Sequence, residues 1–127
     1  MEEIHKQIVE DYVNAYNNFN IDGMTINLDE NIVFENISNG KVDLRTEGLI
    51  EFRKQAESAK QYFRQRKQTI ESWVFRDRVV VIHILYNAIL AIDLPNGMKS
   101  GDTLEMKGRS TFEFENNKIT KISDRSL

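Results

Sequence analysis

The chain has 127 residues, the length of one domain, and we predict a single domain over residues 1–127. Hydrophobic residues make up 40% and charged residues 29%, values typical of a globular fold that exclude a long disordered chain. The net charge is −3 and basic residues are interleaved with acidic ones, so we expect no nucleic-acid partner. Cysteine is absent, which excludes disulfide bonds, thiolate zinc sites and thiol nucleophiles.

Two features bear on the location of the protein. The N-terminus begins Met1-Glu2-Glu3 and lacks the basic and apolar segments of a signal peptide. The longest apolar stretch, Val79 to Ile92, is interrupted by His83 and Asn87 and is shorter than the ~20 residues that span a bilayer. We therefore expect a cytoplasmic protein with no membrane partner. One local basic cluster, Arg64-Gln65-Arg66-Lys67, is interpreted as a solvated face.

Two helices are predicted at the start of the chain. From Ile4 to Phe19, apolar residues recur at helical spacing and cover about half of the helix surface. This pattern indicates an amphipathic helix with Tyr12 near the middle of its buried face. Asn20 is a suitable N-cap for a short second helix that continues to about Asn27.

A hairpin and a third helix are predicted next. The segment from Asn31 to Ser38 alternates like a strand, and Asn39-Gly40 is a strong hairpin turn into a strand from Lys41 to Arg45. A third helix is expected to start near Thr46. Its apolar positions at helical spacing are Leu49, Phe52 and Ala56.

The remainder of the chain is predicted to be β structure. A strand ending at Phe75 turns at Arg76-Asp77-Arg78 into a strand from Val79 to Asp93. After a loop, a strand from Thr103 to Glu115 turns at two asparagines into a last strand from Lys118 to Arg125. Three helices and a meander of strands predict an α+β domain whose helices cover one face of an antiparallel sheet. The inward face of the fifth strand is Leu104, Met106, Gly108, Ser110, Phe112 and Phe114.

The order of these elements resembles the nuclear-transport-factor-like (NTF2-like) superfamily, which includes ketosteroid isomerases and SnoaL-like polyketide cyclases. The resemblance covers nearly the whole chain. It is carried by Tyr12-Val-Asn-Ala-Tyr16-Asn-Asn with Asp22-Gly23, by Asp29-Glu-Asn-Ile-Val-Phe-Glu-Asn36, and by Gly108-Arg-Ser-Thr-Phe-Glu-Phe-Glu-Asn-Asn-Lys-Ile119. It implies a cone-shaped, strongly curved antiparallel sheet, with three helices from the N-terminal half covering the concave face around a mostly apolar cavity. Homodimers formed through the outer face of the sheet are also implied.

The resemblance also implies positions for a ketosteroid isomerase site. Such an enzyme uses a carboxylate base, a tyrosine and a protonated aspartic acid. Ungapped matching of the motifs puts Tyr12 at the tyrosine, Asn36 at the base and Ser110 at the protonated acid. An amide cannot accept a proton at neutral pH, so we do not expect ketosteroid isomerase activity. These three side chains could instead hold a ligand carbonyl or hydroxyl, or satisfy one another and buried water.

Asp124 is a second candidate for chemistry. Ile122 matches a pocket-facing position in the last strand of the resembled family, and strand alternation then turns Asp124 inward as well. Desolvation inside an apolar cone would favour the protonated carboxyl group, a condition for a usable acid or base. Alternatively, Asp124 lies at the open end, solvated or paired with Arg109 or Arg125.

Two functions from different classes follow. One is a small-molecule-binding domain without chemistry, and the other is a SnoaL-like cyclase, isomerase or dehydratase acting on a polyketide-like or steroid-like carbonyl compound. In the second, Asp124 is the acid/base. The predicted ligand-binding residues are Tyr12, Tyr16, Asn36, Phe52, Tyr86, Met106 and Ser110. We expect no cofactor and no metal, because the two histidines lie in separate segments without a metal-binding motif.

The outer face of the sheet is predicted to form a homodimer. If the Arg76-Asp77-Arg78 turn pairs Phe75 with Val79, then Glu71 lies opposite His83 and Trp73 opposite Val81. This register leaves His83 outside the pocket, as strand alternation also does for Glu35. The predicted apolar dimer patch is Trp73, Val81, Leu85 and Ile89, accompanied by His83 and Glu71.

Overall fold

The computed structural model describes residues 2–127, so Met1, which the predicted domain includes, lies outside the described residues. Within them, three helices and six strands follow one another as an α+β domain. The helices are α1 (Glu2–Asn17), α2 (Ile21–Thr25) and α3 (Leu49–Lys60). The strands are β1 (Leu28–Ser38), β2 (Lys41–Glu47), β3 (Phe63–Arg76), β4 (Val79–Leu90), β5 (Thr103–Glu115) and β6 (Lys118–Ser126).

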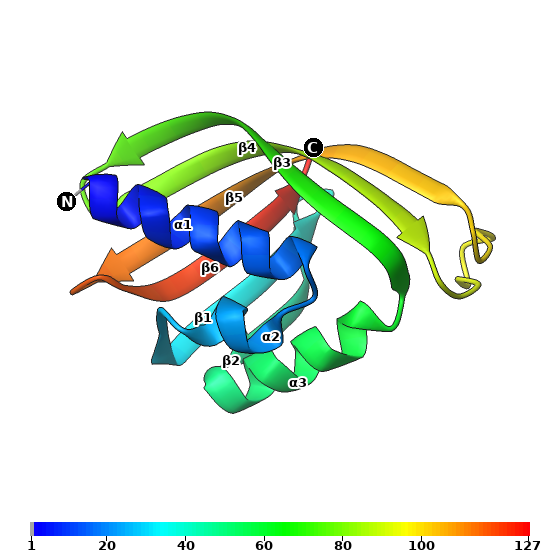
Figure 1. Cartoon of the computed structure of the whole chain (residues 1–127), viewed down its shortest axis with the longest axis horizontal. Coiled ribbons are helices and arrows are strands. Elements are labelled where there is room, and N and C mark those ends of the chain that lie inside the picture. The colour runs from blue at the N-terminus through cyan, green and yellow to red at the C-terminus, as the bar shows by residue number, and fades with distance from the viewer. Residues whose placement is uncertain (1) are drawn as a thin grey trace.

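The strands form one curved sheet in the order β2-β1-β6-β5-β4-β3. Figure 1 shows α1 lying across its concave face, with α3 beside β1 and β2 and with α2 in contact with α1 and α3. The predicted fold class is confirmed, but the sheet is mixed and not wholly antiparallel, because β1 and β6 run parallel. These two strands come from opposite ends of the chain, so no tight turn imposes an antiparallel direction on them.

The ends of the helices follow local chemistry. The side chain of Asn20 accepts a hydrogen bond from the backbone N–H of Gly23 at 2.9 Å, which confirms the predicted N-cap of α2. Helix α3 begins at Leu49 and not near Thr46, because Thr46 pairs with Phe34 and continues strand β2. Gly48 separates strand from helix with a φ of 88°, a conformation that glycine adopts without strain.

The predicted register of the β3–β4 hairpin is wrong by one residue at its turn. The turn is shorter than expected, since Arg76 pairs with Val79 and leaves two residues between the strands. Trp73 therefore lies opposite Ile82 on the concave face, where it packs against the core and stacks on Phe75 with ring centroids 5.7 Å apart. Because turn length sets the register of a hairpin, this one-residue error moved Trp73 to the wrong face.

A β-bulge returns the part of β3 that precedes Glu71 to its predicted register with β4. The register shifts between Ile70 and Ser72, so Glu71 is the extra residue and Ser72, not Glu71, lies opposite His83. On the concave side the alternation then continues through Ile70 and Gln68.

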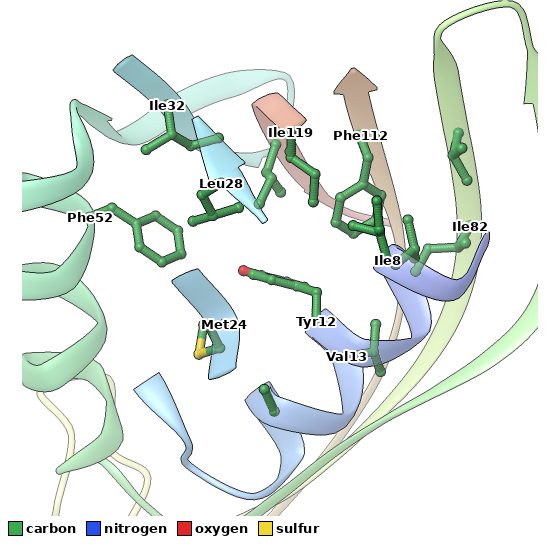
Figure 2. Packing of buried hydrophobic residues seen from close by; sticks show 14 of the residues in the cluster. Ile8, Tyr12, Val13, Met24, Leu28, Ile32, Phe52, Ile82, Phe112 and Ile119 are labelled. Carbon is green, nitrogen blue, oxygen red and sulfur yellow. The ribbon is translucent and has the colours of Figure 1, made fainter. Parts of the chain in front are cut away.

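The hydrophobic core fills one end of the cone. Figure 2 shows Ile8 and Tyr12 of α1 packing against Ile82 of β4 and Phe112 of β5. Phe112 is 1% exposed and Ile82 is 0% exposed, and burial of such side chains stabilises a fold by roughly 1.5–3 kcal/mol each. Within residues 2–127, none of the helices combines the length and the hydropathy of a transmembrane span.

Candidate functional site

The other end of the cone holds a cavity of about 370 Å³ between the concave sheet face, α1 and α3. This volume falls within the ~300–1,000 Å³ typical of small-molecule sites. The lining includes every predicted pocket residue, namely Tyr12, Tyr16, Asn36, Phe52, Tyr86, Met106, Ser110 and Asp124. The structure thus brings these side chains to one cavity, and their contact with a ligand stays a prediction.

Three polar side chains form a row across neighbouring strands on the cavity wall. Asp124 of β6 pairs in register with Asn36 of β1 on one side and with Ser110 of β5 on the other. The Ser110 hydroxyl donates a hydrogen bond to Oδ1 of Asp124 at 2.7 Å, and Asn36 is exposed on the same wall. The carboxylate therefore stands between the two positions that the family resemblance assigned to a base and an acid.

The carboxyl group of Asp124 is tuned by its surroundings. Burial raises its pKa from 3.8 to about 6, although the hydrogen bond from Ser110 opposes this increase. No ion pair joins Asp124 to Arg109, Arg125 or another cation among residues 2–127. The alternative in which Asp124 pairs with one of these arginines is therefore not observed. A pKa near neutrality lets one group both accept and return a proton.

Three tyrosines supply neutral hydroxyl groups to the cavity. Burial, followed by the nearby negative charge of Asp124, raises the pKa of Tyr12 well above its usual value, and its hydroxyl points toward Phe52 in Figure 2. The hydroxyl oxygens of Tyr16 and Tyr86 are 3.0 Å apart and hydrogen-bonded, and burial also raises both of their pKa values. All three side chains are thus neutral hydrogen-bond donors at physiological pH.

Arg66 was missed by the sequence analysis. It belongs to the basic cluster interpreted as solvated, and its neighbours Arg64 and Lys67 are exposed, but Arg66 itself is only 5% exposed and lines the cavity. Its Nε donates a hydrogen bond to the backbone carbonyl of Tyr16 at 2.9 Å. Period-two alternation from the inward Gln68 and Ile70 would have turned Arg66 inward, had the cluster not been judged by its charge.

The remaining candidates lie away from the cavity. His83 lies on the outer face as predicted, with Nδ1 3.2 Å from the Ser72 hydroxyl. Glu35 forms ion pairs with Arg45 at 2.5 Å and Lys121 at 3.4 Å, and the hydrogen bond from Arg45 lowers its pKa. Residues 2–127 contain no group of three His, Cys, Asp or Glu side chains that could hold a metal ion.

Comparison with known proteins extends this description. A model of the SnoaL-like domain matches residues 9–122. No curated protein sequence matches the chain significantly. Among similar structures, a proposed SnoaL-like polyketide cyclase from Jannaschia sp. CCS1 has a TM-score of 0.83 at 10% identity, covering 98% of this chain and 85% of that one.

Two further structures have the same fold. A proposed polyketide cyclase from Xanthomonas campestris has a TM-score of 0.82 at 16% identity, covering 97% of this chain and 90% of its own. An LEH-like epoxide hydrolase from M. tuberculosis has a TM-score of 0.77 at 17% identity, covering 98% and 84%. Because these identities are so low and the named activities differ, the similarity shows the fold and not the reaction.

Proposed function

The chain belongs to the family of SnoaL-like domains, and on that premise we propose that it binds a small carbonyl compound in its cavity and moves a proton on that compound with Asp124. The observation that carries this proposal is an unpaired carboxyl group on the wall of an otherwise largely apolar cavity, with its pKa raised to about 6. The function is acid–base catalysis of an isomerisation or ring closure.

The proposed reaction begins at a carbon next to the ligand carbonyl. The Asp124 carboxylate takes a proton from that carbon, and the electrons of the broken C–H bond move onto the carbonyl oxygen to form an enolate. Neutral donors aimed at the developing oxyanion lower the barrier, and Tyr12 and Asn36 are the candidates. If a double bond is conjugated with the enolate, return of the proton to the far end of that double bond isomerises the compound. If a second carbonyl lies within reach, the enolate carbon attacks it and closes a ring, and the alkoxide formed takes the proton from Asp124.

The cavity walls favour a flat, apolar substrate. Aromatic and aliphatic side chains dominate the lining, and Phe34 and Phe52 meet edge to face with ring centroids 5.8 Å apart. Two of the similar structures are proposed polyketide cyclases, and on that basis we choose a polyketide-like carbonyl compound as the substrate class. Binding without turnover remains the second candidate, favoured by Asn36 at the position where a ketosteroid isomerase has its base.

Hydrogen exchange on a simple ketone tests the proposal without knowledge of the natural substrate. The wild-type protein should accelerate replacement of the α-hydrogens of 2-tetralone by deuterium, followed by proton NMR. Asp124→Asn should slow this exchange about 10²- to 10⁴-fold, because it removes the group that transfers the proton. Glu35→Gln is the matched control, because Glu35 is a carboxylate on the opposite face of the neighbouring strand. This substitution should leave the exchange rate unchanged. Equal rates for wild type and Asp124→Asn would leave only the binding function.

The outer sheet face supports a proposed homodimer. Without Trp73, its apolar side chains are Val74, Val81, Leu85 and Ile89, next to the hydrogen-bonded Ser72 and His83. Each is partly exposed, and neighbouring strands hold them together in one patch. Sedimentation at micromolar concentration should give twice the chain mass and Val81→Lys should give the monomer, whereas a wild-type monomer would contradict this assembly.

A further inference from the structure

Arg66 is a buried cation without a counterion. Its side chain is only 5% exposed, and no carboxylate forms an ion pair with it among residues 2–127. Buried charges in proteins are normally paired, because an isolated one loses its hydration without compensation. Nη2 is buried and has no hydrogen-bond partner within residues 2–127. Arg66 could therefore accept one negatively charged partner.

The guanidinium group is held firmly in this unpaired position. Its central carbon lies 3.7 Å from the ring centroid of Tyr16 and 4.5 Å from that of Phe19, so two aromatic faces contact it. The side chain of Asn17 donates to the carbonyl of Gln68 at 3.1 Å and accepts from its N–H at 2.8 Å, which ties the end of α1 to β3. Arg66 is therefore oriented before any ligand arrives, and this lowers the entropic cost of binding.

The lining of the cavity includes one carboxylate, Asp124, and three arginines, of which Arg66 is buried and Arg109 and Arg125 are partly exposed. Arg66 and Asp124 both line it and form no ion pair with each other, and the hydrogen-bonded Tyr16 and Tyr86 share the wall with them. An anionic ligand group beside Arg66 would gain a partner, while the same group beside Asp124 would be repelled. The arrangement thus gives a ligand one preferred orientation.

We propose that Arg66 binds a carboxylate of the ligand and so directs the ligand's carbonyl end toward Asp124. The planar guanidinium fork matches a carboxylate with two parallel hydrogen bonds, and burial strengthens such charged bonds relative to water. The preferred substrate class is therefore an aromatic or polyketide-like ketone that also carries a carboxylate, whereas a simple ketone such as 2-tetralone is only a probe of Asp124. This inference deepens the proposed function and rests on it for the role of Asp124, although the carboxylate contact itself is measured without turnover.

Binding of 2-naphthoate and 2-naphthamide, which have nearly the same shape and differ in charge, tests the inference by calorimetry. Wild-type protein should bind the carboxylate about 10- to 100-fold more tightly, as expected for a buried hydrogen bond to a charged group. Arg66→Gln should lose this preference while keeping its affinity for the amide. Arg64→Gln is the matched control, an exposed arginine two positions away on the same strand, and should retain the preference.

The outcomes separate this inference from the proposed function. Asp124→Asn should keep or increase the carboxylate preference although it slows exchange, because it removes a negative charge from the cavity. Equal wild-type affinities for the two compounds overturn the carboxylate site even if ketone exchange depends on Asp124. If Arg66→Gln does not fold, the test uses the melting temperature of wild-type protein with each compound. Only a larger increase with the carboxylate than with the amide supports the site.

Discussion

The two ends of the cone are built from the same strands, but one end is filled with core side chains and the other encloses the cavity. Along β5, Phe112 and Phe114 are buried in the core, whereas Met106 and Ser110 face the cavity. Along β6, the core residue Ile122 is followed two positions later by the cavity residue Asp124. Alternation therefore decides which face of the sheet a side chain takes, while side-chain size and polarity decide whether that part of the face is filled or hollow.

The largest expected effect is a loss of stability when a core side chain at the filled end is truncated. Phe112→Ala should lower the free energy of unfolding by about 3–5 kcal/mol, because it leaves a cavity among close-packed side chains, including Tyr12 at 5.7 Å between ring centroids. Met106→Ala, at the hollow end of the same strand, should cost ~1 kcal/mol or less, since it only widens an existing cavity. Urea denaturation measures both. Similar losses for the two variants would contradict the division into a filled and a hollow end.

A pH-dependent effect at the hollow end comes next. The native Asp124 carboxyl group has a pKa of about 6 and its ordinary value is 3.8, so the native state binds the proton more tightly than the unfolded state. Stability is therefore lost as the pH rises from about 4 to about 6, by ~2 kcal/mol in total. Asp124→Asn should remove this dependence and gain stability relative to wild type above pH 6. Denaturation midpoints of both proteins between pH 4 and 8 measure this dependence. Wild-type stability that rises relative to that of Asp124→Asn as the pH increases would contradict the prediction.

The smallest expected effect concerns the tyrosine pair on the cavity wall. Tyr16→Phe removes the hydroxyl that is 3.0 Å from the Tyr86 hydroxyl and should cost about 1 kcal/mol of stability. Tyr86→Phe should cost a similar amount. The double variant should cost less than the sum, because the first substitution already breaks the shared bond. Additive losses in a thermal denaturation cycle would mean that each hydroxyl instead bonds to water in the cavity.

The sequence predicted the fold and much of the cavity for identifiable reasons. The N-cap at Asn20 and the inward alternation of Ser110 and Asp124 are local patterns that depend on neighbouring residues only. The pairing of Asn36 with Asp124 could not be derived in this way, because it joins two distant strands in parallel without a turn that fixes their register. Family motifs placed each residue in the pocket, but not side by side.

The errors have local causes as well. The sequence pattern predicts Trp73 on the outer face only if the turn before Val79 contains one residue more than it does in the structure. Arg66 was assigned to solvent because its neighbours are charged, and charge in a sequence is usually a sign of exposure. A residue that breaks such a rule without a compensating partner is where sequence patterns fail and where function is concentrated.

The bulge at Glu71 has a consequence for how this fold diversifies. Ile70 pairs with Ile84 and Ser72 with His83, which are consecutive positions on β4, so removal of Glu71 would leave every side chain of β3 on its present face. What the extra residue changes is the bend and twist of the strand, and through them the width of the cone. Insertion or deletion of one residue at this point is therefore expected to change the bend of β3, and with it the width of the cavity, without turning any cavity side chain to the other face.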